Sequence, residues 1–154
     1  MKSFKIVLLA LPLLLIGQQA KAHCEIPCGI YDDSLRIALL YEHITTIEKS
    51  MHEIIALEAS GEDANQLVRW VINKEEHAKK MQEIISQYFM HQRIKPKDVG
   101  EIGRDVYIRQ LELMHRLSIY AMKAKQSTDT ALLAQMRDTL HLFEHAYFPG
   151  EHSH

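Results

Sequence analysis

The stretch from Ser34 to Ala59, SLRIALLYEHITTIEKSMHEIIALEA, decides the fold of this 154-residue chain. Its large apolar residues recur at alternating steps of three and four, at Ile37, Leu40, Ile44, Ile47, Met51 and Ile54. That spacing places them on one stripe of an amphipathic helix. Asp32-Asp33-Ser34 offers helix-capping side chains at the start, and Ser60-Gly61 interrupts the pattern at the end.

Three further segments carry the same kind of stripe. The second uses Leu67, Trp70, Ala78, Met81, Ile85 and Tyr88, the third uses Val99, Ile102, Val106, Leu113, Leu117 and Tyr120, and the fourth uses Leu132, Met136, Leu140, Phe143 and Tyr147. Pro96 and Ser127-Thr128-Asp129 separate them, and Gly103 weakens the start of the third. No alternating strand pattern is present. The sequence therefore predicts an all-α protein, an antiparallel four-helix bundle over residues 32–154 preceded by a short N-terminal hook.

The first 22 residues have the pattern of a secretory signal peptide. Two lysines precede an apolar run from Ile6 to Gly17, and Ala20-Lys21-Ala22 forms a small-x-small cleavage site. The run is shorter than the roughly 20 residues that span a bilayer, although a retained membrane anchor is the alternative. We expect signal peptidase to remove residues 1–22, leaving an exported protein, periplasmic or secreted, with no membrane association after processing. The net charge of −2 gives no basic surface for nucleic acid.

Residues 23–31, HCEIPCGIY, contain both cysteines of the chain. Cleavage after Ala22 would give His23 a free α-amine beside its imidazole, and Cys24 and Cys28 would add two thiolates. The amine, the Cys24 amide nitrogen and the Cys24 thiolate can chelate in consecutive rings, and a turn at Pro27 brings Cys28 back. Planar nitrogen and sulfur ligation suits Ni(II) or Cu(II), whereas zinc prefers a tetrahedron.

This stretch closely resembles the N-terminal hook of the nickel superoxide dismutase family, His-Cys-x-x-Pro-Cys-Gly-x-Tyr, at every fixed position. The resemblance implies one redox-active nickel ion (Ni2+/Ni3+) per subunit, bound by His23, Cys24 and Cys28, with Tyr31 beside the metal as an ordering and gating residue. It implies conversion of superoxide to dioxygen and hydrogen peroxide, and a homohexamer of four-helix subunits. Apolar residues outside the narrow stripes, such as Ile108, Leu111 and Ile119, offer either contact surface for such an assembly or a broader core.

The chain departs from the family at some positions around the hook. Glu25 stands where some members have an aspartate. Ala38 and His77 stand, in a rough match, where some members support the axial histidine with a glutamate and an arginine. The partner of the His23 imidazole therefore stays open at this point.

Three other interpretations compete with nickel catalysis. Cys24 and Cys28 could form a disulfide without metal, although such a short loop constrains little chain entropy. A metal carrier or sensor could use a histidine cluster near the C-terminus, made of His141, His145, His152 and His154. Di-iron chemistry needs two Glu-x-x-His motifs, and only Glu112 to His115 fits, so it is set aside.

Overall fold

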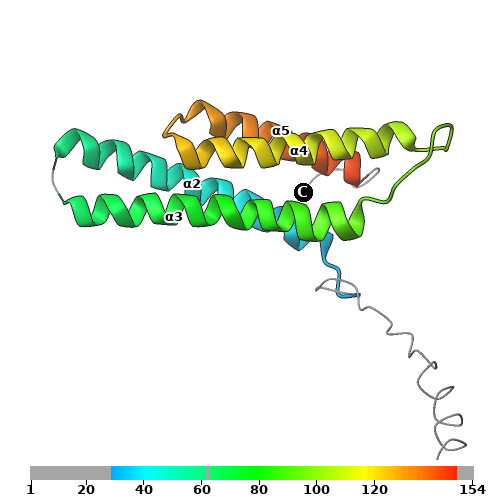
Figure 1. Ribbon diagram of the computed structural model, residues 1–154, viewed down its shortest axis with the longest axis horizontal. Helices are drawn as coiled ribbons and strands as arrows, with labels where there is room; N and C mark the ends of the chain where they lie inside the picture. Colours follow the sequence, from blue (N-terminus) through cyan, green and yellow to red (C-terminus); the bar gives the residue numbers. More distant parts are fainter. Residues whose placement is uncertain (1–28, 62, 149–154) are drawn as a thin grey trace, which may run out of the picture.

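The computed structural model describes residues 29–61 and 63–148, and all regular structure in those ranges is helical (Figure 1). The helices are α2 (Asp33–Ser60), α3 (Ala64–Glu83), which continues into the π-helix η1 (Ile84–Arg93), α4 (Arg104–Gln126) and α5 (Ala131–Tyr147). The predicted antiparallel four-helix bundle is confirmed. Residues 1–28, which include the predicted signal peptide and most of the hook, lie outside the described residues.

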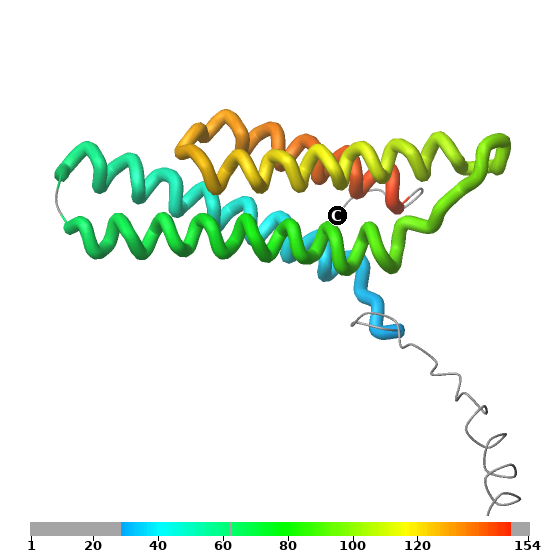
Figure 2. The backbone as a smooth tube through the Cα atoms, in the orientation of Figure 1, coloured from blue at the N-terminus to red at the C-terminus, as the bar shows by residue number. Residues whose placement is uncertain are grey.

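The four helices pack as a ring, with α2 against α3, α3 against α4, α4 against α5, and α5 against α2. The α2–α3 pair reaches farther at one end than the α4–α5 pair does (Figure 2). Fully buried side chains from all four helices fill the centre, including Leu40, Met81, Leu117 and Phe143. Alanines at 78, 121 and 124 are also fully buried, where their small size lets neighbouring backbones approach.

Side chains satisfy the start of α2 and the end of α4, and a glycine satisfies the end of α2. The Asp32 carboxylate accepts a hydrogen bond from the backbone N–H of Leu35 at 2.9 Å, which confirms the predicted cap of the first helix. Gly61 ends α2 in the left-handed conformation at φ 66°, where a side chain would be strained. The buried ammonium of Lys74 donates to the carbonyls of Ser127 at 2.7 Å and Lys125 at 3.3 Å, and so caps the end of α4.

The prediction for the start of the third segment is wrong. Val99 and Ile102 are 87% and 97% exposed, and α4 begins only at Arg104. Gly100 and Gly103 have φ values of 90° and 85°, so the chain turns there instead of forming a helix. Gly103 is the N-cap of α4 and lies outside the helix that it was expected to weaken.

The second segment differs from the prediction in its last ten residues. Ile84–Arg93 is a π-helix, in which hydrogen bonds join residues five apart. It ends where the Ile94 N–H donates to the Phe89 carbonyl at 2.8 Å. None of the helices in the described residues is long and apolar enough to cross a membrane.

Candidate metal centre and the Asp33 cluster

Tyr31 is the one predicted site residue that lies within the described part of the chain. It is the last residue of the hook and is 43% exposed, two residues before α2 begins. His23, Cys24 and Cys28 lie outside the described residues. What the structure does describe is the cluster of side chains on which the end of the hook rests.

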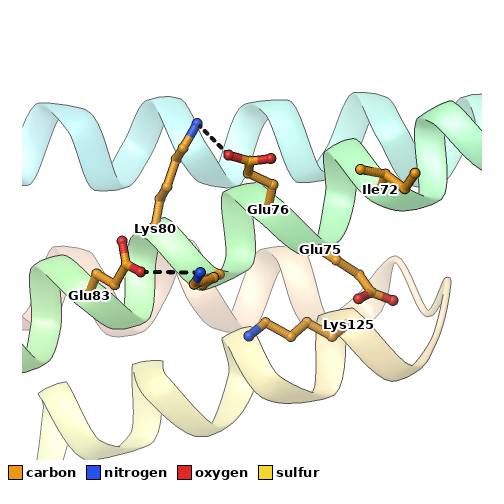
Figure 3. A pocket seen from close by; sticks show the side chains of 7 residues that line it. Ile72, Glu75, Glu76, Lys80, Glu83 and Lys125 are labelled. Carbon is orange, nitrogen blue, oxygen red and sulfur yellow. Dashed lines mark ion pairs between the residues drawn. The ribbon is translucent and has the colours of Figure 1, made fainter.

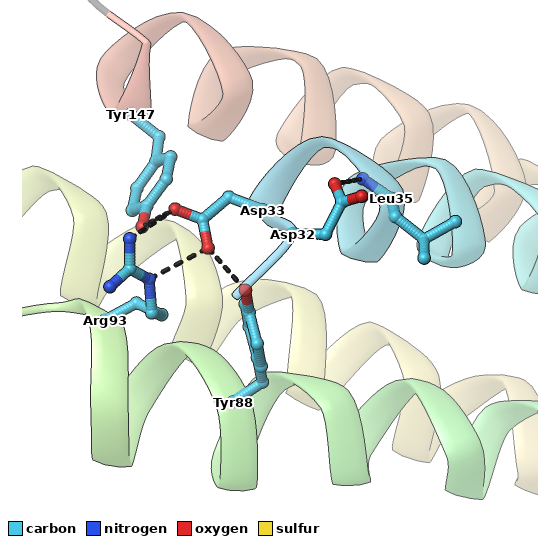
Figure 4. A network of polar contacts seen from close by, with 6 residues as sticks. All are labelled: Asp32, Asp33, Leu35, Tyr88, Arg93 and Tyr147. Atoms are coloured by element: carbon cyan, nitrogen blue, oxygen red, sulfur yellow. Dashed lines mark hydrogen bonds and ion pairs between the residues drawn. The ribbon is translucent and has the colours of Figure 1, made fainter. Parts of the chain in front are cut away.

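The centre of that cluster is the carboxylate of Asp33, the first residue of α2 (Figure 4). The Arg93 guanidinium holds it with two hydrogen bonds, Nε to Oδ1 at 2.8 Å and Nη2 to Oδ2 at 2.6 Å. The Tyr88 hydroxyl donates to Oδ1 at 2.5 Å, and the Tyr147 hydroxyl donates to Oδ2 at 2.9 Å. Asp33 therefore ties η1 and the end of α5 to the start of α2.

The π-helix explains how Tyr88 and Arg93 reach one carboxylate. Side chains five residues apart lie about 140° apart around an α-helix of 3.6 residues per turn. The wider π turn, which bonds residues five apart, brings such side chains onto one side of the helix. In η1, Tyr88 and Arg93 both contact Asp33 from a single helix.

The hydrogen bonds of the cluster shift the pKa of each member. Burial by itself raises the pKa of Asp33, but the hydrogen bonds from Arg93, Tyr88 and Tyr147 outweigh it and hold that pKa below its usual value. Burial, followed by the hydrogen bond to Asp33, raises the pKa of Tyr88 and that of Tyr147 to about 12 each. The hydrogen bond to Asp33 raises the pKa of Arg93. At neutral pH the cluster is one carboxylate held by a cation and two neutral hydroxyls.

Tyr31 packs on the same cluster through its ring. The Arg93 guanidinium carbon lies 4.3 Å from the centroid of the Tyr31 ring, within the range of a cation–π contact. The Tyr88 ring meets Tyr31 edge to face, with centroids 6.1 Å apart. The ion pair with Asp33 fixes the guanidinium, and the guanidinium in turn supports the last residue of the hook.

Sequence reasoning missed the roles of Asp33, Arg93 and Tyr147 in this cluster. Asp33 was grouped with Asp32 as a capping residue, and Tyr147 was placed in the core. One helix start needs only one capping carboxylate. The presence of a second aspartate next to Asp32 could therefore have indicated that Asp33 has another role. Nothing in the sequence pattern marked the π turn that brings Arg93 to it.

Ala38 and His77, which were matched to a supporting glutamate and arginine in the family, do not form a corresponding ion pair. Ala38 is exposed and has no side-chain donor. His77 meets His43 across α2 and α3, with the two Nδ1 atoms 3.0 Å apart. Burial is the main cause that lowers the pKa of both rings. Neither position supplies a carboxylate or guanidinium within the described residues.

A comparison with family models decides the affiliation of the chain. The model described as nickel-containing superoxide dismutase matches residues 18–150, which is most of the 154 residues and includes the whole hook. The chain belongs to the nickel-containing superoxide dismutase family. No curated protein and no solved structure matched the chain.

Membership of this family gives the enzyme its cofactor, nickel, and its substrate, superoxide, and makes it an oxidoreductase. Within residues 29–61 and 63–148, no group of three or more histidine, cysteine, aspartate or glutamate side chains is placed to hold a metal ion. The hook carries both cysteines of this superoxide dismutase, and thiolates with nitrogen donors suit nickel. The donor chemistry of residues 23–28 therefore fits the family's metal.

A surface groove beside α3 is lined by Ile72 and by six charged side chains from glutamates and lysines. Lys79 pairs with Glu83 at 3.7 Å, and Lys80 pairs with Glu76 at 3.4 Å, while Lys125 extends toward α3 from α4 (Figure 3). These are exposed ion pairs along one helix, which contribute little to stability. None of the residues that line the groove is a histidine or a cysteine.

Proposed function

We propose that this superoxide dismutase binds its nickel with the processed N-terminus that begins at His23. The ligands are the α-amine and imidazole of His23, the backbone nitrogen and thiolate of Cys24, and the thiolate of Cys28. The support is the donor chemistry of the stretch and the family match, which spans it. Each metal ion belongs to one subunit.

When bound, nickel supplies one-electron redox chemistry between its +2 and +3 states. Over one cycle, two superoxide ions and two protons give one dioxygen and one hydrogen peroxide. The anionic thiolates and the amide nitrogen favour the higher oxidation state, because they donate charge to it. They bind only when deprotonated, so nickel loading fails in acid.

The bundle contributes a fixed support for the hook. The observation that carries this is the contact of Tyr31 with Arg93, whose guanidinium is clamped by Asp33. A nine-residue segment cannot bury enough surface to order itself, so it depends on such an anchor. The high pKa values of Tyr88 and Tyr147 keep their hydroxyls protonated, so both act as permanent donors to Asp33. Tyr31 then stands next to the metal as a group that orders the hook and restricts access.

The same proposal includes the processing and the location of the protein. Residues 1–22 are the signal peptide, 23–31 the hook and 32–154 the bundle domain. Signal peptidase exposes His23, and the mature enzyme works in the periplasm or outside the cell.

The subunits assemble as a homohexamer, for which Ile108, 44% exposed on α4, offers apolar surface. Leu111 packs against the core instead. Light scattering at working concentration that gives a monomer with full activity would contradict the assembly.

Mass spectrometry of the mature N-terminus, with nickel analysis of the same sample, tests the proposal. We expect the active chain to begin at His23 with about one nickel per chain. The matched variant is a mature chain that begins at Ala22, in which the amine of His23 is converted to a backbone amide. Full activity with Ala22 attached, or nickel retained after Cys24→Ser and Cys28→Ser, would show that the ligand set is wrong.

A further inference from the structure

Two histidines near the end of α5 lie apart from the hook and from the Asp33 cluster. His141 and His145 are one helical turn apart, and both are exposed. Their Nε2 atoms are 3.1 Å apart, and their rings meet nearly at right angles with centroids 4.4 Å apart. The Nε2 atoms of the two rings therefore face each other at hydrogen-bond distance on the surface.

That separation is the one a shared metal ion requires. An imidazole nitrogen lies about 2.0–2.1 Å from a bound first-row divalent ion. Two nitrogens 3.1 Å apart then subtend an angle of about 95–102° at the ion. This lies between the right angle of square-planar or octahedral coordination and the wider tetrahedral angle, so the separation of the two nitrogens fits a shared ion that replaces the hydrogen bond between them. Histidines four residues apart on one helix face are a recurrent chelating pair.

We propose that His141 and His145 bind one divalent first-row transition ion, with nickel or copper preferred, through the Nε2 atoms of both rings. Imidazole suits these ions, and affinity rises toward copper along the divalent series. Within residues 29–61 and 63–148, no group of three or more histidine, cysteine, aspartate or glutamate side chains is placed to hold a metal ion, so the described part of the chain supplies two ligands. Glu144, between the two histidines, accepts a hydrogen bond from Tyr41 at 3.2 Å and so faces α2.

The site is distinct from the proposed nickel hook in both chemistry and position. Its donors are two neutral imidazoles on a rigid helix, whereas the hook offers thiolates. It nevertheless lies at the end of the bundle where the hook joins α2, because Tyr147, two residues beyond His145, bonds Asp33. The inference does not depend on how the hook binds its metal.

Nickel chloride titration of the purified nickel-loaded enzyme, followed by calorimetry and equilibrium dialysis, tests the proposal. The nickel already present is counted beforehand, so only additional binding is measured. We expect one further ion per chain. His141→Ala and His145→Ala should each weaken its binding by about tenfold or more, because a chelate becomes a single ligand. Alanine favours the helix, and circular dichroism checks that α5 stays folded.

Two matched variants distinguish this site from other histidines. His115→Ala removes an exposed histidine on α4, and a chain with His152→Ala and His154→Ala removes the histidines of the C-terminal tail. Both should bind the additional nickel as the parent does. Unchanged binding in His141→Ala and His145→Ala overturns the proposal. So does equal loss in the His115→Ala or tail variants, which would indicate nonspecific or tail binding.

Discussion

Replacing Asp33 by asparagine tests whether the cluster beneath the hook holds the bundle end together. Asparagine keeps the size of the side chain but removes its charge. It also replaces one acceptor oxygen with an amide that can only donate. Of the four hydrogen bonds that Asp33 accepts, those to one oxygen are lost, and Arg93 becomes a partly buried cation without its anion.

The expected cost lies between two limits. The side chains of Asp33 and Arg93 are 14% and 26% exposed. Breaking a fully buried ion pair from one side costs about 3–5 kcal/mol, and an exposed pair is worth up to about 1 kcal/mol. With partial burial and two tyrosine donors, we expect Asp33→Asn to lower the free energy of unfolding by about 2–3 kcal/mol.

Urea denaturation followed by circular dichroism measures this value, at fixed protein concentration because subunit association also contributes. Asp32→Asn is the matched control, since it makes the same chemical change one residue earlier. Asparagine caps a helix as well as aspartate does, so the control should change stability by only a few tenths of a kcal/mol. Equal effects of the two variants would refute the role given to Asp33.

The pH dependence provides a second check on the same variant. The folded pKa of Asp33 lies below its unfolded value of 3.8, so the unfolded chain takes up the proton first as pH falls. The stabilisation is therefore complete above about pH 4 and is lost as pH falls through the folded pKa. The difference between the parent and Asp33→Asn should shrink over that acidic range. A difference that stays constant down to pH 2 would mean that the charge of Asp33 is not its source.

Three other perturbations have defined outcomes. Tyr31→Leu should speed nickel loss to a chelator and lower kcat, whereas Tyr31→Phe keeps the ring and should retain nickel at the parental rate; identical loss rates for the two would contradict the stacking argument. Lys74→Met should cost about 1–2 kcal/mol in urea denaturation, because the carbonyl of Ser127 loses a charged donor, and an unchanged midpoint would count against that cap. Because His43 and His77 have folded pKa values below 6.5, stability should rise with pH up to about 6.5 and level off above it, and His77→Gln should flatten this rise in denaturation series from pH 5 to 8.

The bundle itself could be predicted from the sequence because its helices are long and their stripes are regular. Ile37, Leu40 and Ile44 all lie in the core as their spacing indicates. The failure at Val99 and Ile102 has a physical cause. These two residues continue the spacing of the third stripe, but Gly100 and Gly103 adopt left-handed conformations, so α4 begins only after Gly103. The spacing of apolar residues carries no information about backbone conformation. The preference of Gly100 and Gly103 for a turn therefore decided the local structure, although Val99 and Ile102 fit the helical spacing.

The candidate site also has one part that the sequence indicates and one part that only the fold brings together. The proposed ligands His23, Cys24 and Cys28 lie within nine residues, so their chemistry could be inferred from the sequence alone. The support beneath Tyr31 comes from residues 33, 93 and 147, which are far apart in the chain and meet only in the fold. The interaction also depends on a π-helix, for which the apolar pattern of Ile84–Arg93 gives no distinctive signal.

The central claim is that the processed N-terminus of this chain supplies the nickel ligands. X-ray absorption at the nickel edge of the purified mature enzyme tests it most directly. We expect sulfur and nitrogen neighbours together in the first coordination shell of the parent enzyme, and no bound nickel in Cys24→Ser or in Cys28→Ser. A first shell of nitrogen and oxygen alone in the active parent enzyme would contradict it.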